Sequence, residues 1–177
     1  NDGQILLIDD NLTIQNNYIT LNFDLRSPAR VMSLKYNNVE QLLEPTYFSA
    51  LGLKTGSWVV AAQVDFLGNN QYLIHYQNTD VTVKIEIIPR NNYFYYRVLE
   101  ITDIDLVGSL EVLRLYMNRA PHGGALNRDW ALSAGQNELF VNILPLTPDS
   151  DCGRYPDGSL GPSGIYYCIG SQYLNLT

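Results

Sequence analysis

The stretch of residues 81–101 constrains the fold of this chain more than any other. Aliphatic side chains at Val81, Val83, Ile85 and Ile87 alternate with the polar residues between them. A period of two places the aliphatic side chains on one face of a strand and the polar ones on the other. The dipeptide Asn91-Asn92 tolerates positive φ, and the aromatic and β-branched residues after it suit a returning strand. The sequence therefore predicts a β-hairpin with one face on a core.

Segments of the same kind recur along the chain and predict an all-β protein. The further strands are predicted at residues 4–9, 12–14, 18–24, 30–36, 39–43, 57–66, 72–76, 110–117, 130–133, 138–144 and 165–169. Short turns join 57–66, 72–76 and the hairpin into an antiparallel meander. Leu110, Leu113 and Met117 also fit a helical spacing, but the surrounding strands favour a strand there. Residues 145–164 are predicted to form a long irregular loop.

The chain of 177 residues shows no second-domain boundary, so residues 1–177 are predicted to form one antiparallel β-sandwich. A jelly roll is one architecture that such a sandwich can take. Residues 1–10 have two interpretations. The apolar run at 4–9 is either an edge strand of its own domain or a strand exchanged with a neighbouring subunit, because terminal strands exchange most easily.

The charge of the chain excludes some classes of partner. The net charge is −7, and the 11 Lys and Arg residues form no cluster. Nucleic-acid phosphates and anionic membrane surfaces both require basic patches, so neither is an expected partner. No apolar run approaches the roughly 18 residues that a membrane span needs, so no membrane span is expected.

Several features together predict an extracellular or cell-surface location. Cys152 and Cys168 flank a loop rich in Gly, Pro and Asp, and a disulfide there would contribute about 3 kcal/mol; two free thiols are the alternative. Asn11 and Asn175 begin glycosylation triplets. The chain starts without Met, which suggests a processed mature chain or a fragment. These features, the low charged fraction of 16% and the 13 tyrosines suit secretion.

Three residues are candidate contacts for a carbohydrate or a protein partner. Tyr93 and Tyr95 share one side of the predicted strand, and both sugar rings and protein interfaces favour tyrosine; ordinary packing is the alternative. His122 precedes two glycines in a loop, where the backbone can approach a ligand, although an exposed turn explains it equally simply. His75 is predicted to be an ordinary sheet residue.

No cofactor is expected, with calcium as the one candidate metal. Asp149, Asp151 and Asp157 supply carboxylates in one predicted loop, and such oxygen-rich loops bind calcium. The glutamate that ends an EF-hand loop is replaced by Leu160, and a solvated acidic loop is the alternative. Serine-elbow, phosphate-loop, zinc and dinucleotide motifs do not occur in the sequence, so no catalytic residue is predicted.

One segment resembles a known family. Ser33-Leu-Lys-Tyr36, the turn Asn37-Asn38 and then Val39-Glu40 are similar to an early hairpin of the galactose-mutarotase-like supersandwich. The resemblance covers residues 18–43 and continues more loosely through 81–102 and 110–119. It implies the N-terminal module of a secreted glycoside hydrolase or rhamnogalacturonan-type polysaccharide lyase. Neither histidine matches the epimerase motif, so the resemblance assigns no catalytic residue.

Three functions are consistent with the sequence. The first is a non-catalytic extracellular β-sandwich, a structural or adhesive subunit that is glycosylated and self-assembles into a homo-oligomer or filament through its N-terminal strand. The alternative is the carbohydrate-associated module that the resemblance implies. A free-standing sugar epimerase or lyase is the third.

Overall fold

The computed structural model describes residues 3–116, 132–136, 139–143, 150–155 and 164–170, with side chains described for residues 3–116. The described chain is almost entirely strand, and its one helical element is the 3-10 turn η1 (Ile104–Leu106). All pairings are antiparallel, which confirms the predicted all-β sandwich.

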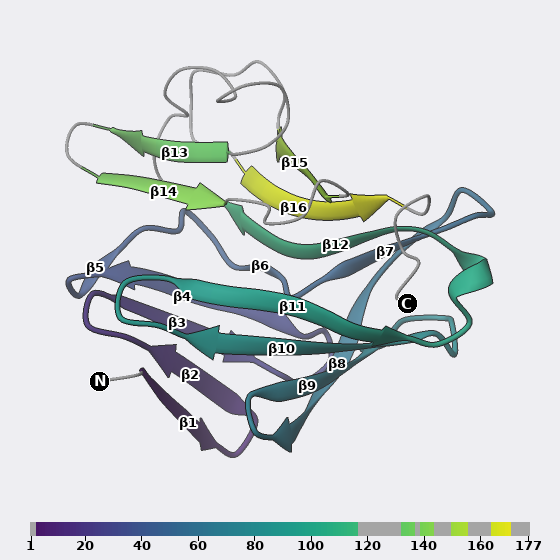
Figure 1. Cartoon of the computed structure of the whole chain (residues 1–177), viewed down its shortest axis with the longest axis horizontal. Coiled ribbons are helices and arrows are strands. Elements are labelled where there is room, and N and C mark those ends of the chain that lie inside the picture. The colour runs from purple at the N-terminus through teal and green to yellow at the C-terminus, as the bar shows by residue number, and fades with distance from the viewer. Residues whose placement is uncertain (1–2, 117–131, 137–138, 144–149, 156–163, 171–177) are drawn as a thin grey trace.

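The first sheet is built from the beginning of the chain (Figure 1). Its strands follow one another in the order β1 (Gln4–Ile8), β2 (Asn11–Gln15), β3 (Ile19–Asp24), β4 (Arg30–Tyr36) and β5 (Val39–Glu40), and β6 (Thr46–Tyr47) also pairs with β4. Positive φ angles at Asp9, Asn37 and Asn38 form two of its turns, as the abundance of Asn and Asp at these places predicts.

The second sheet is larger and curls around the first (Figure 1). Its order is β11 (Phe94–Ile101), β10 (Thr82–Pro89), β9 (Gln71–Tyr76), β8 (Trp58–Gly68), β7 (Ala50–Leu53), β12 (Val107–Tyr116), β16 (Gly164–Gly170) and β15 (Ser150–Tyr155). A separate pair consists of β13 (Leu132–Gln136) and β14 (Leu139–Ile143).

The core lies between the two sheets. Leu12, Ile14 and Phe23 of the first sheet and Ile74 and Ile85 of the second are almost wholly inaccessible to solvent. Each fully buried side chain of this size contributes about 1.5–3 kcal/mol through the hydrophobic effect, so the core dominates the stability of the fold.

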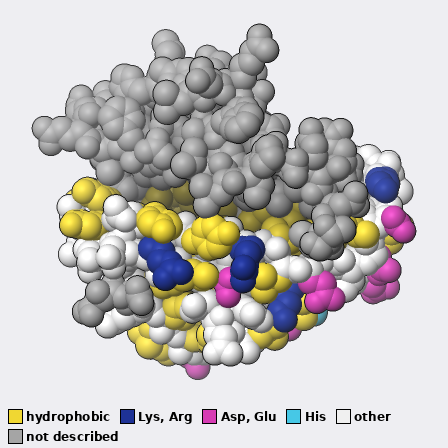
Figure 2. Space-filling view, viewed as in Figure 1, with side chains coloured by type: hydrophobic (Ala, Val, Ile, Leu, Met, Phe, Trp, Pro, Cys, Tyr) yellow, Lys and Arg dark blue, Asp and Glu magenta, His cyan; other side chains and the backbone are white. Residues whose placement is uncertain are grey.

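The central hairpin matches its prediction. Val83, Ile85 and Ile87 of β10 are buried, and the residues between them are not. On the opposite face of β9–β11, Lys and Arg side chains are interspersed with Asp and Glu (Figure 2). The strand predicted at 110–117 is also confirmed, as β12.

The prediction of a continuous loop over residues 145–164 is wrong at its centre. β15 occupies residues 150–155 and pairs with β16. Local Pro, Gly and Asp residues suggested a loop, but antiparallel pairing with β16, the next strand along the chain, makes this segment a strand.

Candidate interaction surface

β1 forms an open edge of the first sheet. Within the part of the chain that the structure describes, β1 pairs with β2 and with no other strand. Leu6, Leu7 and Ile8 are 55%, 39% and 59% exposed, and the strand carries no charged residue. Natural edge strands are usually protected by charges, proline, a bulge or a covering segment. β1 has no charge, proline or bulge, so apolar side chains and backbone groups are both accessible.

The strand order answers one question that the sequence left open. Residues 4–8 pair with residues 11–15 of the same chain, so β1 is an edge strand of its own sheet in this structure. Ile5 and Leu7 lie opposite Ile14 and Leu12, on the core face, while Leu6 lies opposite Thr13, on the outer face. Exchange of this strand between subunits stays a prediction.

The hydrogen-bonding groups of β1 alternate in direction. Ile8 and Asn11 close a two-residue turn at Asp9-Asp10 and therefore form a hydrogen-bonded pair. Bonded and non-bonded pairs alternate along an antiparallel ladder, so Leu6 directs its N–H and C=O toward β2. Ile5 and Leu7 direct theirs to the open edge, where a further strand would bind them.

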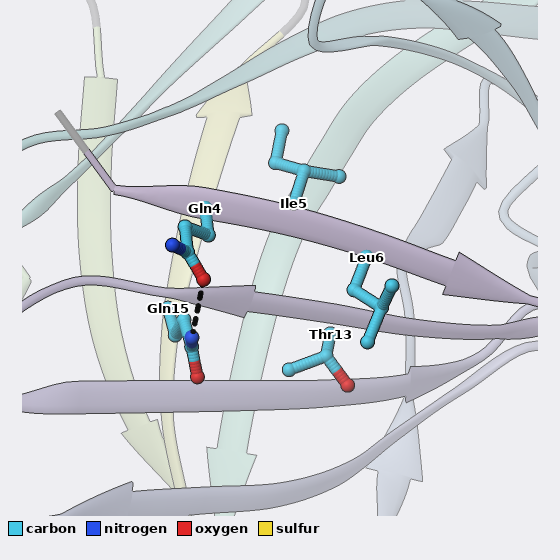
Figure 3. Close-up of a pocket in the computed structure, with 5 residues that line it drawn as sticks. All are labelled: Gln4, Ile5, Leu6, Thr13 and Gln15. Atoms are coloured by element: carbon cyan, nitrogen blue, oxygen red, sulfur yellow. Dashed lines mark hydrogen bonds between the residues drawn. The ribbon is translucent and has the colours of Figure 1, made fainter.

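A shallow pocket of about 390 Å³ lies beside this edge and is lined by Gln4, Ile5, Leu6, Thr13 and Gln15 (Figure 3). The Gln15 side-chain amide donates to Gln4 Oε1 over 3.0 Å. All the side chains that line the pocket are uncharged.

The beginning of β1 is held against the second sheet. A Cβ atom on Gly3 would lie 2.2 Å from the Gln15 carbonyl oxygen and 2.6 Å from Pro89 Cβ, so only glycine fits. This contact places the exposed Arg90, which follows Pro89, near the start of β1.

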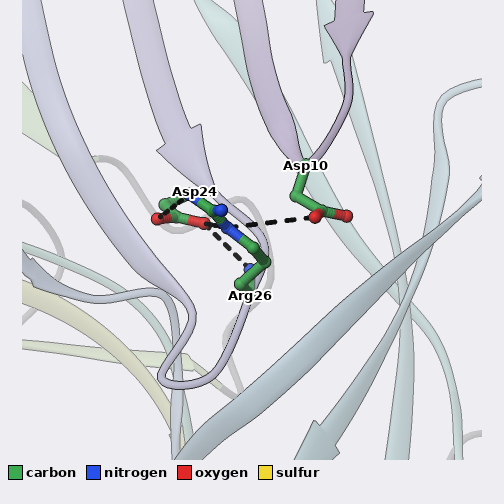
Figure 4. A network of polar contacts seen from close by, with 3 residues as sticks. All are labelled: Asp10, Asp24 and Arg26. Atoms are coloured by element: carbon green, nitrogen blue, oxygen red, sulfur yellow. Dashed lines mark hydrogen bonds and ion pairs between the residues drawn. The ribbon is translucent and has the colours of Figure 1, made fainter.

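The other end of β1 is acidic (Figure 4). Arg26 Nε lies 3.1 Å from Asp24 Oδ1 and 3.8 Å from Asp10 Oδ2. The hydrogen bonds from Arg26 hold the pKa of Asp24 below its ordinary value. With Asp9 next in the turn, three carboxylates lie near the two guanidinium groups of Arg26 and Arg30, so this end of the strand carries net negative charge.

A histidine–carboxylate pair on the outer face was not predicted. His75 Nε2 lies 2.8 Å from Asp65 Oδ2, and the Gln63 amide donates to Asp65 Oδ1 over 2.7 Å. The Gln63 hydrogen bond lowers the pKa of Asp65, and His75 adds to the effect. The side chains of His75 and Asp65 are 40% and 42% exposed, so the pair lies on an open strand surface. Histidine beside a carboxylate is a unit that can transfer protons.

A buried ion pair on β12 has a structural explanation. Glu111 is 2% exposed, and Arg114 Nε lies 2.8 Å from its Oε1. The Arg114 guanidinium also stacks over the Tyr47 ring, 5.0 Å from its centroid. Thr46 donates to the Arg114 carbonyl, so the contacts join β6 to β12. The two charges neutralise each other, as burial requires.

The two predicted tyrosines differ in exposure, and their role as contacts stays a prediction. Tyr93 precedes β11 and is 54% exposed, whereas Tyr95 lies inside β11 opposite Ile88 and is partly buried. The Asn16 amide donates to the Tyr93 carbonyl, and Tyr18 N–H donates to Asn16 Oδ1. Tyr93 therefore lies near the turn that carries Tyr18.

Tyr18 forms part of a second aromatic feature. Its ring stacks on that of Tyr36, with centroids 6.4 Å apart and planes inclined by 23°. Tyr18 is also 49% exposed. The stacked pair and Tyr93 therefore lie near the same turn.

The structure describes only some of the remaining predicted site residues. Asn11 is exposed at the start of β2. In the β15–β16 ladder Cys152 lies opposite Tyr167, and Cys168 lies opposite Asp151, so the two cysteines are offset by one residue along the ladder. A disulfide between them stays a prediction. Asp151 lies in β15. Asp149, Asp157, His122 and Asn175 lie outside the described residues. Over the residues that were described, no three His, Cys, Asp or Glu residues group as metal ligands.

No protein-family model matches the chain, and a search of the curated proteins finds no match. No helix in the described part of the chain is both long and apolar enough to cross a membrane.

Proposed function

We propose that this chain is a non-catalytic extracellular β-sandwich, a structural or adhesive subunit that joins partner chains by strand addition at β1. The observation that carries the proposal is the open edge of β1, which is apolar, uncharged and accessible. An extended partner segment would bind the outward N–H and C=O groups of Ile5 and Leu7 and cover the exposed side chains.

The energetics favour a contact of moderate strength. Leu6, Leu7 and Ile8 are already about half covered, so full burial of each adds roughly 1 kcal/mol. Each new hydrogen bond adds about 0.5–1.5 kcal/mol. Association opposes these gains with several kcal/mol of lost freedom. A single strand contact is therefore expected to be reversible.

The extracellular part of the proposal rests on the sequence. Asn11 is exposed and available to a glycan. It lies opposite Ile8, so a glycan there would stand beside the edge. Mass spectrometry of the native material, before and after enzymatic deglycosylation, tests occupancy at Asn11.

A labelled strand peptide tests the edge directly. The probe is a peptide of alternating valine and threonine with a terminal lysine, titrated by fluorescence anisotropy. Leu7→Pro removes an outward N–H and leaves the β1–β2 hydrogen bonds in place. Leu7→Ala is the matched control, because it also removes the side chain but keeps the N–H. We expect saturable binding to wild type and to Leu7→Ala, within about tenfold, and loss of binding in Leu7→Pro.

Either of two results would overturn the proposal. One is the absence of saturable binding to the wild-type chain. The other is equal binding to Leu7→Pro, once circular dichroism has shown that this variant is folded. The first result removes the strand-addition function, and the second places the peptide on another surface.

The second candidate is the carbohydrate-associated module. The stacked pair of Tyr18 and Tyr36 favours it, because aromatic faces bind sugar rings, and the resemblance at residues 18–43 covers the same turn. Affinity electrophoresis in gels that contain pectic polysaccharides is the test. Retardation of the wild type that Tyr18→Ala abolishes and Trp58→Ala, at an exposed aromatic residue of β8, preserves would support this candidate. Equal mobility in gels with and without polysaccharide would exclude these polysaccharides as ligands.

A further inference from the structure

We propose that the partner strand at β1 is the β1 strand of a second copy of this chain, antiparallel and related by a two-fold axis through Leu6. The inference rests on the proposed function, because it names the occupant of the same edge. It is carried by the symmetry of the sequence Gln4-Ile5-Leu6-Leu7-Ile8 and by the charges at the two ends of the strand.

The two faces of the sheet restrict the possible registers. Ile5 and Leu7 lie on the core face, and Gln4, Leu6 and Ile8 on the outer face. A two-fold axis perpendicular to the sheet keeps each face on its own side, and cross-strand partners share a face. The two-fold axis must therefore pass through a residue, and not between two residues, for the sheet to continue from one copy to the other. The candidate registers are centred on Ile5, Leu6 or Leu7.

The register centred on Leu6 pairs apolar residues with one another and places no carboxylate opposite an apolar residue. It pairs Leu6 with Leu6 and Ile5 with Leu7, and it leaves Gln4 opposite Ile8. A register centred on Leu7 would place Ile5 opposite Asp9. A register centred on Ile5 would place Leu7 opposite Gly3, which has no side chain to pack. The Leu6 register therefore buries the most apolar surface without covering a carboxylate.

The ends of the strand add charge complementarity. In the Leu6 register, Asp9 of one copy lies opposite Gly3 of the other. Gly3 contacts Pro89, so the exposed Arg90 is near that position. The acidic end that contains Asp9, Asp10 and Asp24 thus approaches a basic residue in the second copy. A parallel arrangement would instead bring the two acidic turns together.

The register also fixes the geometry at the axis. Leu6 directs its backbone groups toward β2, so the Leu6–Leu6 contact is a non-hydrogen-bonded pair, with Cα atoms about 4.5 Å apart. That separation lies within the range that a disulfide bridges. The contact uses the same surface on both copies, so it closes at a dimer.

Cysteine scanning of the full chain tests the register. Leu6→Cys, Ile5→Cys and Leu7→Cys are each oxidised mildly, with the wild type as the control for the native cysteines. We expect a covalent dimer from Leu6→Cys, at least about tenfold more abundant than from the other two variants. We also expect the wild type to convert from monomer to dimer between about 1 and about 200 µM in sedimentation equilibrium.

The outcomes separate this inference from the proposed function. A wild type that stays monomeric over this range while the valine–threonine peptide binds overturns the inference and leaves the proposed function standing. Preferential dimers of Ile5→Cys or Leu7→Cys overturn the register. A monomer that also fails to bind the peptide overturns both.

Discussion

β1 and β11 each end a sheet, yet their exposed chemistry differs. β11 carries Arg97 and Glu100, and Arg97 forms an ion pair of 2.8 Å with Glu86 on β10. A register shift between Lys84 and Ile85 also interrupts the β10–β11 ladder. Charges and irregular pairing are two devices by which proteins prevent edge-to-edge association.

β1 has neither device, although it is the shorter and more regular strand. Its five residues pair with β2 without a register shift, and none is charged. The comparison shows that this chain protects one edge and leaves the other accessible. An unprotected edge in a folded protein is either an aggregation hazard or a binding surface, and the charge pattern around β1 favours binding.

The largest expected effect comes from protecting β1 in the way that β11 is protected. Leu6→Lys places two lysines opposite each other in the dimer and removes two apolar contacts. Each Leu contributes about 1.5–3 kcal/mol when fully buried and is here half covered already, so we expect association to weaken about 10²-fold or more. Sedimentation equilibrium measures the change.

Leu67→Lys is the control for this substitution. Leu67 is 50% exposed on β8, an interior strand of the second sheet. We expect this variant to associate like the wild type. Equal weakening by both substitutions would show that charge in general, rather than the β1 edge, governs association.

The converse change is expected to have a smaller effect. Arg97→Leu combined with Glu100→Leu removes both charges from β11 and makes its outer face resemble that of β1. We expect added concentration-dependent association, about tenfold at most, because the register shift remains. Light scattering measures it; a gain as large as the loss in Leu6→Lys would show that charge alone protects β11.

A charge swap tests the ends of the strand. Arg90→Glu is expected to weaken the dimer about three- to tenfold, because exposed ion pairs contribute about 0.2–1 kcal/mol and each occurs twice. Asp9→Lys in the same chain is expected to restore affinity. Weakening by both changes without recovery would contradict the antiparallel arrangement. Added salt should reduce the difference between the variants.

The smallest effect concerns the turn after β1. Arg26→Gln removes the guanidinium that lowers the pKa of Asp24, so we expect that pKa to rise toward its ordinary value. A lowered folded-state pKa stabilises the fold above the unfolded pKa, and this contribution is lost as pH falls through the folded pKa. The variant should therefore lose less stability than the wild type on acidification below about pH 4. NMR titration of the Asp24 carboxyl carbon measures the pKa, and an unchanged value would contradict the assigned cause.

The β-hairpin at residues 81–101 could be predicted from the sequence because its apolar residues alternate regularly. The structure buries the same residues, Val83, Ile85 and Ile87. The sequence also predicted β1 as a strand, but an apolar run of this length does not say which strand it pairs with. That choice depends on the two-residue turn at Asp9-Asp10 and on contacts with distant residues such as Pro89.

The His75–Asp65 contact shows a second limit. Counting back from the turn at Asn69-Asn70 places Asp65 opposite Ile74 and therefore on the face opposite to His75. Register shifts in the β8–β9 ladder pair Asp65 with Leu73 and Gln63 with His75 instead. These shifts move both side chains to one face. Alternation predicts faces only where the register is regular, so a bulge hides such pairs from sequence analysis.

The most direct test of the open β1 edge is hydrogen exchange of its individual backbone amides at low and high protein concentration. At low concentration, we expect the outward amides of Ile5 and Leu7 to exchange rapidly and those of Leu6 and Ile8 to be protected by β2. At high concentration, Ile5 and Leu7 should also become protected, by at least about tenfold. Rapid exchange of Ile5 and Leu7 at every concentration, in a sample that nevertheless associates, would contradict strand addition at this edge.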